Sequence, residues 1–270
     1  GVPLFEGRMV DIFDYRAKAY QGGRGRQAVW NELNFGDPAK AVTPQWRIPM
    51  ESVPDKLGSS WQLPRIGFCD IASPSNSRTL VATLIPGGVL CGHKVPTLSF
   101  SPEEIDLSFL WLGIANSFCL DFLARQKVAL TMSYTIVDSF PLPRRIEGLP
   151  VEGEIIRRAA QLACCGDAFS SLWDTIVKRG DLQCFEPANE PAQRATVRAE
   201  LDVYVARDFF GLTKDEMRYV LDPSSVLGEQ CGIETFGALK RSEIRQQGTF
   251  VSYGLIMKAW DELPAPLVRH

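Results

Sequence analysis

The sequence predicts an α+β fold in which a strand-rich half precedes a helical half. Residues 61–100 hold short β-branched and apolar runs separated by turn-forming residues, whereas apolar residues recur at helical spacing from residue 151 onward. We therefore expect two domains: a strand-rich domain with one long buried helix at 1–150, and a helical domain at 151–270 that packs on it.

The expected strands follow a first segment with little regular structure. Residues 21–56 hold Gly, Pro and scattered aromatic residues, which is typical of a loop that packs against another layer. The turn-forming run Ser-Pro-Ser-Asn-Ser at 73–77 separates two of the strands. The runs expected to form strands are 65–71, 79–85, 97–100 and 133–140.

The long helix of the first half has a clear start signal. Ser101 is suited to the N-cap and Pro102 to the first helical position, while Glu104 completes a capping box. The residues that follow are apolar on every face, so we expect a substantially buried helix that ends near Gln126.

The helical half carries a second start signal and a stop signal. Thr213 and Glu216 form a capping box that starts a helix over 214–221. Pro223 ends that helix, because proline has no amide hydrogen to donate. A final helix is expected at about 250–262.

Composition excludes several classes of protein. The chain has 270 residues, of which 45% are hydrophobic and 23% charged, so it is long and apolar enough to bury a core. Its net charge of −3 is unlike that of most nucleic-acid binders, although its basic residues are mainly arginines. Polar residues interrupt the longest apolar stretch, at 107–123, which argues against a membrane span. Seven cysteines without a CxxC pair indicate reduced thiols in the cytoplasm.

Residues for catalysis are scarce. His93 and His270 are the only histidines, and no Gly-x-Ser-x-Gly motif accompanies them, so a stand-alone hydrolase is disfavoured. The glycine cluster at 22–25 lacks the lysine of a phosphate-binding loop, which favours an ordinary surface loop. We expect no metal and no catalytic residue in this chain.

Short collinear segments give the chain a resemblance to a known group of enzymes. The segments are PLFEGRM (3–9), FDYR (13–16), PQWRIP (44–49), RIGFCDI (65–71), SRTLVA (77–82), GHKVP (92–96), NSFCLDFLARQK (116–127), FPLP (140–143), RAELD (198–202), GLTKDEMRYVLDP (211–223) and ETF (234–236). In this order they resemble the C-terminal target-recognition region of adenine-specific DNA methyltransferases from type IIG restriction-modification and phage-defence systems.

The resemblance implies a division of labour between this chain and a missing domain. Methyl transfer from S-adenosylmethionine belongs to an upstream domain with a glycine-rich cofactor motif and an Asn-Pro-Pro-aromatic motif, neither of which occurs here. The chain is then no enzyme by itself, holds no cofactor, and is similar in fold to the DNA-reading domains of type I specificity subunits. Two departures from the family pattern, Ala129-Leu130 and Ser139, leave the loop conformation around 128–140 open.

Arginine, lysine, asparagine and histidine side chains in loops and strands are the candidates for DNA contacts, because they reach phosphates or base edges. Each has a plainer alternative, such as a solvated loop, an ordinary hairpin turn or a cation that complements a helix end. Asn116, on the apolar helix, is expected to be structural. The candidates are Arg24, Arg26, Arg65, Asn76, Arg78, His93, Lys94, Arg125 and Lys127.

Two functions from different classes follow. The first is sequence-specific recognition of double-stranded DNA, with the upstream methyltransferase domain of the same chain as partner and no role for a membrane. The alternative is a protein-interaction or scaffolding module of a phage-defence complex, which agrees more easily with the net charge of −3.

Overall fold

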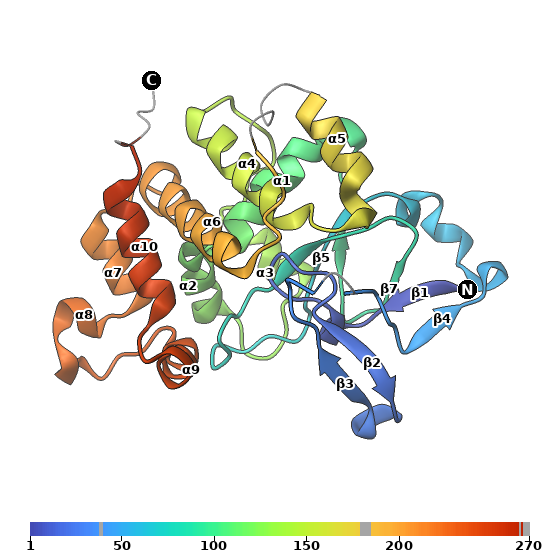
Figure 1. Cartoon of the computed structure of the whole chain (residues 1–270), viewed down its shortest axis with the longest axis horizontal. Helices are drawn as coiled ribbons and strands as arrows, with labels where there is room; N and C mark the ends of the chain where they lie inside the picture. Colours follow the sequence, from blue (N-terminus) through green and yellow to red (C-terminus); the bar gives the residue numbers. More distant parts are fainter. Residues whose placement is uncertain (38–39, 179–184, 265, 267–270) are drawn as a thin grey trace.

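The computed structural model describes residues 1–37, 40–178, 185–264 and 266 (Figure 1). This part of the chain has a mixed α/β fold, which confirms the expectation of a chain with both strands and helices but lends no support to a likeness to the DNA-reading domains of type I specificity subunits. Its strands all lie between residues 2 and 98, and its α-helices begin at residue 105. In Figure 1 the strands occupy one end of the molecule and the last four helices the other.

The strands form two three-stranded sheets and one separate hairpin. In the first sheet β1 lies between β4, which is antiparallel to it, and β7, which is parallel. In the second sheet β5 lies between antiparallel β6 and β8, while β2 and β3 form the hairpin. The bounds are β1 (Val2–Phe5), β2 (Lys18–Gly22), β3 (Val29–Glu32), β4 (Trp46–Ile48), β5 (Arg65–Phe68), β6 (Ala82–Ile85), β7 (Leu90–Cys91) and β8 (Thr97–Leu98).

The helices cover the second sheet and continue away from it. A π-helical turn, Tyr204–Phe209, directly follows α6. The bounds are α1 (Ile105–Ala115), α2 (Phe118–Lys127), α3 (Tyr134–Asp138), α4 (Pro150–Ala163), α5 (Ser170–Lys178), α6 (Pro191–Val203), α7 (Lys214–Leu221), α8 (Ser224–Leu227), α9 (Gly237–Gln247) and α10 (Val251–Glu262).

The main hydrophobic core crosses residue 150, where the sequence predicts a domain boundary. It joins buried residues of β5, β6 and α1 to residues of α4 and α6. Helices α1 and α4 pack closely at Gly113, where an added Cβ atom would lie 2.7 Å from Cγ2 of Ile155. A second cluster joins Phe118 of α2 to buried residues of α6, α7 and α10, including Met217 and Ile256.

The helix expected over 101–126 begins as predicted but is broken in the middle. The capping box of Ser101 and Glu104 is present and leads through a 3-10 turn into α1. The axes of this segment and α2 differ by 68°. The break lies at Asn116, whose side chain bonds the backbone of β6, and at Ser117, which caps α2. Within the described residues no single helix is long and apolar enough to cross a membrane; the bent pair 102–115 and 118–127 meets that criterion only together.

Two other expectations about secondary structure are wrong. The segment 133–140 contains helix α3 at 134–138 instead of a strand, because the Ser133 hydroxyl accepts a hydrogen bond from the Ile136 amide and starts a helical turn. Its β-branched residues had suggested a strand. The stretch 21–56 is not only loop, since it contains strands β3 and β4.

The second capping box is confirmed at the start of α7. The Thr213 hydroxyl accepts from the Glu216 amide at 3.3 Å, and the Glu216 carboxylate accepts from the Thr213 amide at 2.7 Å. The helix ends at Leu221, before Asp222 and Pro223, as expected.

Replacing Thr213 by alanine should lower the free energy of unfolding by about 1 kcal/mol, because an N-cap hydroxyl that satisfies a helix amide contributes about that much. Urea denaturation followed by circular dichroism measures the change. Thr175→Ala is the matched control, since the Thr175 hydroxyl donates to a carbonyl inside α5 and caps no helix. Equal losses in the two variants would contradict the capping role.

Candidate functional site

A groove of about 570 Å³ opens at the carboxyl ends of β1 and β7. Because these strands are parallel, the segments that follow them lie side by side, and the Gly92 amide donates to the Phe5 carbonyl at 3.0 Å. Residues 6–8 and 92–94 thereby line the same groove, although the two segments are far apart in sequence. The other lining residues are Leu4, Phe5, Trp46, Cys69 and Ile71.

The groove presents several hydrogen-bond donors to solvent. Arg8 is exposed, with a long hydrogen bond of 3.5 Å to the Ala28 carbonyl, and His93 is also exposed. Lys94 is half-buried and pairs with Asp70 at 2.7 Å, so its charge is partly balanced. Arg8 and His93 are the groove side chains best placed to meet an anionic ligand.

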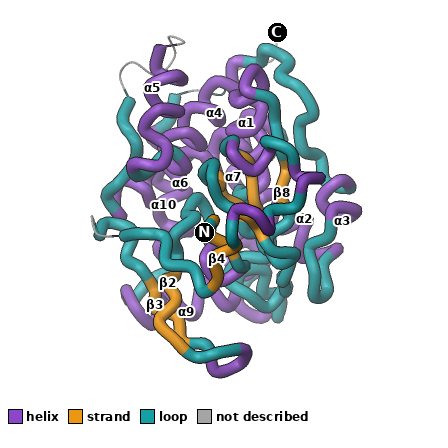
Figure 2. Tube along the Cα trace, turned by 90° about the vertical axis from the view of Figure 1, so that its right-hand side faces the viewer, coloured by secondary structure: helices purple, strands orange, loops and turns teal. Residues whose placement is uncertain are grey.

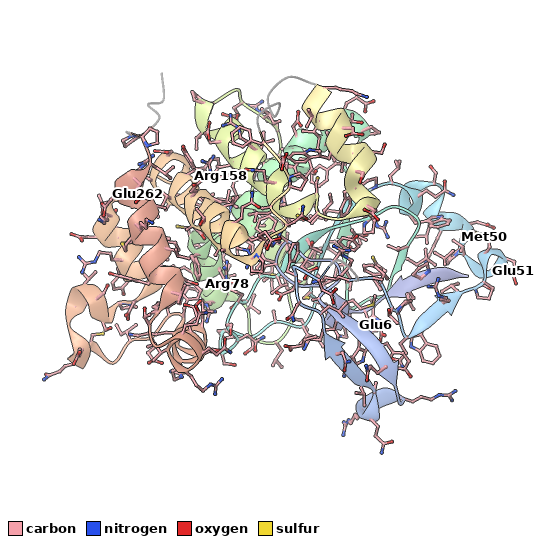
Figure 3. The ribbon with its side chains drawn as sticks, viewed as in Figure 1. Glu6, Met50, Glu51, Arg78, Arg158 and Glu262 are labelled. Atoms are coloured by element: carbon pink, nitrogen blue, oxygen red, sulfur yellow. The ribbon has the colours of Figure 1, made fainter. Side chains whose placement is uncertain are left out.

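One carboxylate also lines the groove. Glu6 lies near the base of the β2–β3 hairpin (Figure 3). Burial raises its pKa, and its Oε2 atom is enclosed without a hydrogen-bond partner among the described residues.

The β2–β3 hairpin extends away from the rest of the chain in both views (Figures 1 and 2). Its strands are braced by the Lys18–Glu32 ion pair at 2.9 Å and by the rings of Tyr20 and Trp30, whose centroids are 5.5 Å apart. Since Arg8 donates to the Ala28 carbonyl, the hairpin is also tied to the rim of the groove.

The tip of the hairpin carries two exposed arginines. Gly23 and Gly25 have φ angles of 81° and 56°, which residues with a Cβ atom rarely adopt, so they allow the tight turn. Arg24 and Arg26 alternate with these glycines and are exposed. No hydrogen bond or ion pair of their side chains occurs within the described residues, which leaves both guanidinium groups available to a ligand.

A buried carboxylate holds the loop between β5 and β6. Asp121 of α2 is fully buried and accepts hydrogen bonds from the Thr79 and Leu80 amides at 2.7 and 2.8 Å. Its other oxygen accepts from the guanidinium groups of Arg78 and Arg125 at 3.2 and 3.3 Å. The segment 116–127 therefore positions the segment 77–82.

Three of the arginines predicted to contact DNA turn inward. Arg65 is buried and donates to the Trp61 and Val89 carbonyls. Arg78 lies between the strand-containing and helical parts (Figure 3), where it donates to the Asn116 carbonyl. Arg125 is buried and donates to four backbone carbonyls, those of Pro74, Asn76, Ser77 and Thr235. All three guanidinium groups are occupied within the chain, because burial requires their donors to be satisfied.

The other predicted residues face outward. Arg24, Arg26, Asn76, His93 and Lys127 are exposed, and Lys94 is half-buried. The Lys127 ammonium group donates to the carbonyl and hydroxyl of Ser139 at 3.1 and 3.0 Å. The structure thus brings His93 and Lys94 into the groove, with the hairpin beside it, while Lys127 braces a neighbouring loop.

Two arginines of α6 hold the segment 11–16 against the helical half. Arg194 donates to the Phe13 carbonyl at 3.0 Å and Arg198 to the Ile12 carbonyl at 2.8 Å. Phe13 has a φ angle of 55°, which is unusual for a residue other than glycine, so these bonds fix a strained turn. The segments FDYR and RAELD therefore meet in a structural junction.

Sequence reasoning missed Arg8 and Trp46 as groove residues. Each lies within a segment that carried the resemblance, 3–9 and 44–49, and that position was the signal that could have found them. It also missed Asp121, because the Thr79 and Leu80 amides that it bonds lie some 40 residues away in sequence.

The described residues contain no group of three or more His, Cys, Asp or Glu side chains placed to hold a metal ion. Burial raises the pKa of the Cys69 thiol, which lines the groove, to about 12. That thiol therefore stays protonated and is a poor nucleophile at neutral pH. Comparison of the chain with protein-family models and with curated proteins gives no match.

Proposed function

We propose that this chain recognises double-stranded DNA as the target-recognition region of a larger adenine-specific DNA methyltransferase of the type IIG restriction-modification or phage-defence kind. The observation that carries the proposal is the exposed pair Arg24 and Arg26 on a projecting hairpin, next to a groove that presents Arg8 and His93. A two-stranded β-ribbon fits the major groove of B-DNA, and arginine bonds both phosphates and guanine edges.

In this proposal the chain binds DNA and the chemistry lies elsewhere. An upstream domain of the same protein would bind S-adenosylmethionine and extrude the target adenine, which is inaccessible while it is stacked in the duplex. The function would be cytoplasmic, where the cell's DNA and reduced thiols are found. Because the net charge is −3, binding has to depend on the local concentration of cations at the hairpin and groove, not on the whole surface.

The test is the salt dependence of DNA binding by the chain, measured by fluorescence anisotropy with a labelled duplex. Each phosphate contact contributes about 0.9 to the slope of log K against log salt concentration. The double variant Arg24→Ala/Arg26→Ala should therefore bind more weakly and lower the magnitude of this slope by about 1.8 if both side chains contact phosphates.

Arg144→Ala/Arg145→Ala is the matched control, since it removes the same charge from an exposed pair outside the groove and the hairpin. We expect the control to bind like the unmodified chain. Equal weakening by the two double variants would mean that only net charge matters, and an unmodified chain without affinity for DNA would overturn the proposal.

The second candidate is a protein-interaction module of a phage-defence complex. Exposed apolar side chains in the helical part favour it, because such residues often mark contact surfaces. Val226, Leu227 and Ile233 are 43, 56 and 47% exposed. If the chain does not bind DNA in the salt titration, the surface formed by Val226, Leu227 and Ile233 becomes the candidate contact site for a partner protein.

A further inference from the structure

The loop between β5 and β6 contains a tight turn whose side chains point to solvent. The Asn76 amide donates to the Ser73 carbonyl at 3.1 Å, which closes a turn with Pro74 at its second position. The Ser73 hydroxyl accepts from the Ser75 amide at 3.2 Å. Residues 74–77 are exposed, and no hydrogen bond of the Asn76 side-chain amide occurs within the described residues.

Arg125 holds this turn from beneath. Its Nη1 donates to the Pro74 carbonyl and, at 2.9 Å, to the Thr235 carbonyl, and its Nη2 donates to the carbonyls of Asn76 and Ser77 at 2.8 and 2.9 Å. With Nε directed to Asp121, all five N–H donors of the guanidinium group are used. The Arg125 guanidinium carbon also lies 4.3 Å from the centroid of the Phe236 ring.

Burying Arg125 in this way is an inefficient means of stabilising the fold. Burying a charged group carries a desolvation cost, and well-packed apolar residues often give an equal or greater stability. The arrangement instead fixes the backbone of one exposed turn at several carbonyl groups. Fixed backbone geometry is what a side chain needs to make bidentate hydrogen bonds to a base edge.

We infer that Asn76 is a base-reading residue, suited to the N6 and N7 atoms of adenine, and that Arg125 is the positioning residue that aims it. This inference rests on the proposed DNA-binding function. The turn begins two residues after Ile71, which lines the groove. In Figure 1 the hairpin tip and the loop that joins β5 to β6 both point to the lower edge of the molecule. The hairpin and groove then supply affinity, and the turn supplies sequence preference.

The experiment selects duplexes from a randomised library with the 270-residue chain and sequences the bound fraction. Asn76→Ala should lower the preference for adenine at one position of the selected motif by about 5- to 150-fold, the worth of a bidentate contact. Arg125→Lys keeps the charge but offers at most three donors, so it should lower preference at the same position. The slope of affinity against salt should stay unchanged in both variants, because no phosphate contact is lost.

Two further variants secure the interpretation. Pro74→Gly loosens the turn at an exposed site while it keeps the Asn76 and Arg125 side chains and the carbonyl at 74 that Arg125 bonds, so it tests positioning even where Arg125→Lys fails to fold. Asn34→Ala removes another exposed asparagine and should leave the motif intact.

The outcomes separate this inference from the proposed function. An unmodified chain that does not bind DNA overturns both. A chain that binds DNA but selects no motif, or selects a motif that Asn76→Ala leaves unchanged, overturns the reading role of Asn76 and leaves DNA binding standing. A motif that is lost at one position in Asn76→Ala but is unaffected by both Arg125→Lys and Pro74→Gly overturns the positioning role.

Discussion

Asp121→Asn should lower the free energy of unfolding by about 3–5 kcal/mol, the cost of removing one partner from a buried ion pair. The asparagine can still accept from the Thr79 and Leu80 amides through its oxygen. Its NH₂ group, however, would face the guanidinium groups of Arg78 and Arg125, which are themselves donors. The two guanidinium groups would then lose the carboxylate oxygen that both of them bond.

Guanidinium chloride denaturation at pH 7 measures this loss. Asp174→Asn is the control, because Asp174 is exposed on α5 and surface substitutions usually change stability by less than about 0.5 kcal/mol. A loss below about 1 kcal/mol in Asp121→Asn would show that water or rearrangement satisfies the two arginines, contrary to the buried network.

Asp202→Asn should have the opposite effect at neutral pH and make the protein more stable. Burial raises the pKa of Asp202 to about 6, against an ordinary value of 3.8, although Arg78, Arg198 and the Phe118 amide counteract the effect. The folded state therefore holds this proton more tightly than the unfolded state. Its contribution to stability is full below about pH 4 and is lost as the pH rises through about 6.

The asparagine removes this pH dependence while its oxygen still accepts from the Phe118 amide, which Asp202 does at 2.7 Å. We expect the variant to gain about 1–3 kcal/mol over the unmodified chain at pH 7.5 and nothing at pH 4, since one pKa unit corresponds to 1.36 kcal/mol. Urea denaturation across pH 4–8 provides the comparison. A constant difference between the two proteins over this range would contradict a raised pKa at Asp202.

Local capping chemistry made parts of the fold predictable. The helix starts at Ser101 and Thr213 depend on neighbouring residues alone, and the structure confirms both capping boxes. The break at Asn116 was not predictable, because it depends on a hydrogen bond to Ala82 in a strand that folds back from elsewhere in the chain. Helix α3 was missed because its Thr, Ile and Val residues favour strands, while a single N-cap serine decides the outcome.

In the candidate site, too, features set by neighbouring residues were predictable and features set by distant contacts were not. Exposure of Arg24 and Arg26 follows from the glycines beside them, which mark a turn at the surface. By contrast, nothing near Arg65, Arg78 or Arg125 in sequence reveals that each guanidinium group meets backbone carbonyls of distant segments. An arginine that binds phosphate and one that binds carbonyl groups look alike until the chain is folded, because both uses need the same donors.

The Arg125 network has a consequence for how such a chain evolves. The side chains at 75 and 76 take no part in the bonds that Arg125 makes to this turn, which end on the backbone carbonyls of Pro74, Asn76 and Ser77. Mutations there can change what the turn displays while the bonds from Arg125 to its backbone remain, whereas a change at 121 or 125 affects the buried ion pair. Descendants of this sequence that have acquired new DNA targets are therefore expected to differ at residues 75 and 76 of the turn and at the hairpin tip. They are expected to retain Asp121 and Arg125.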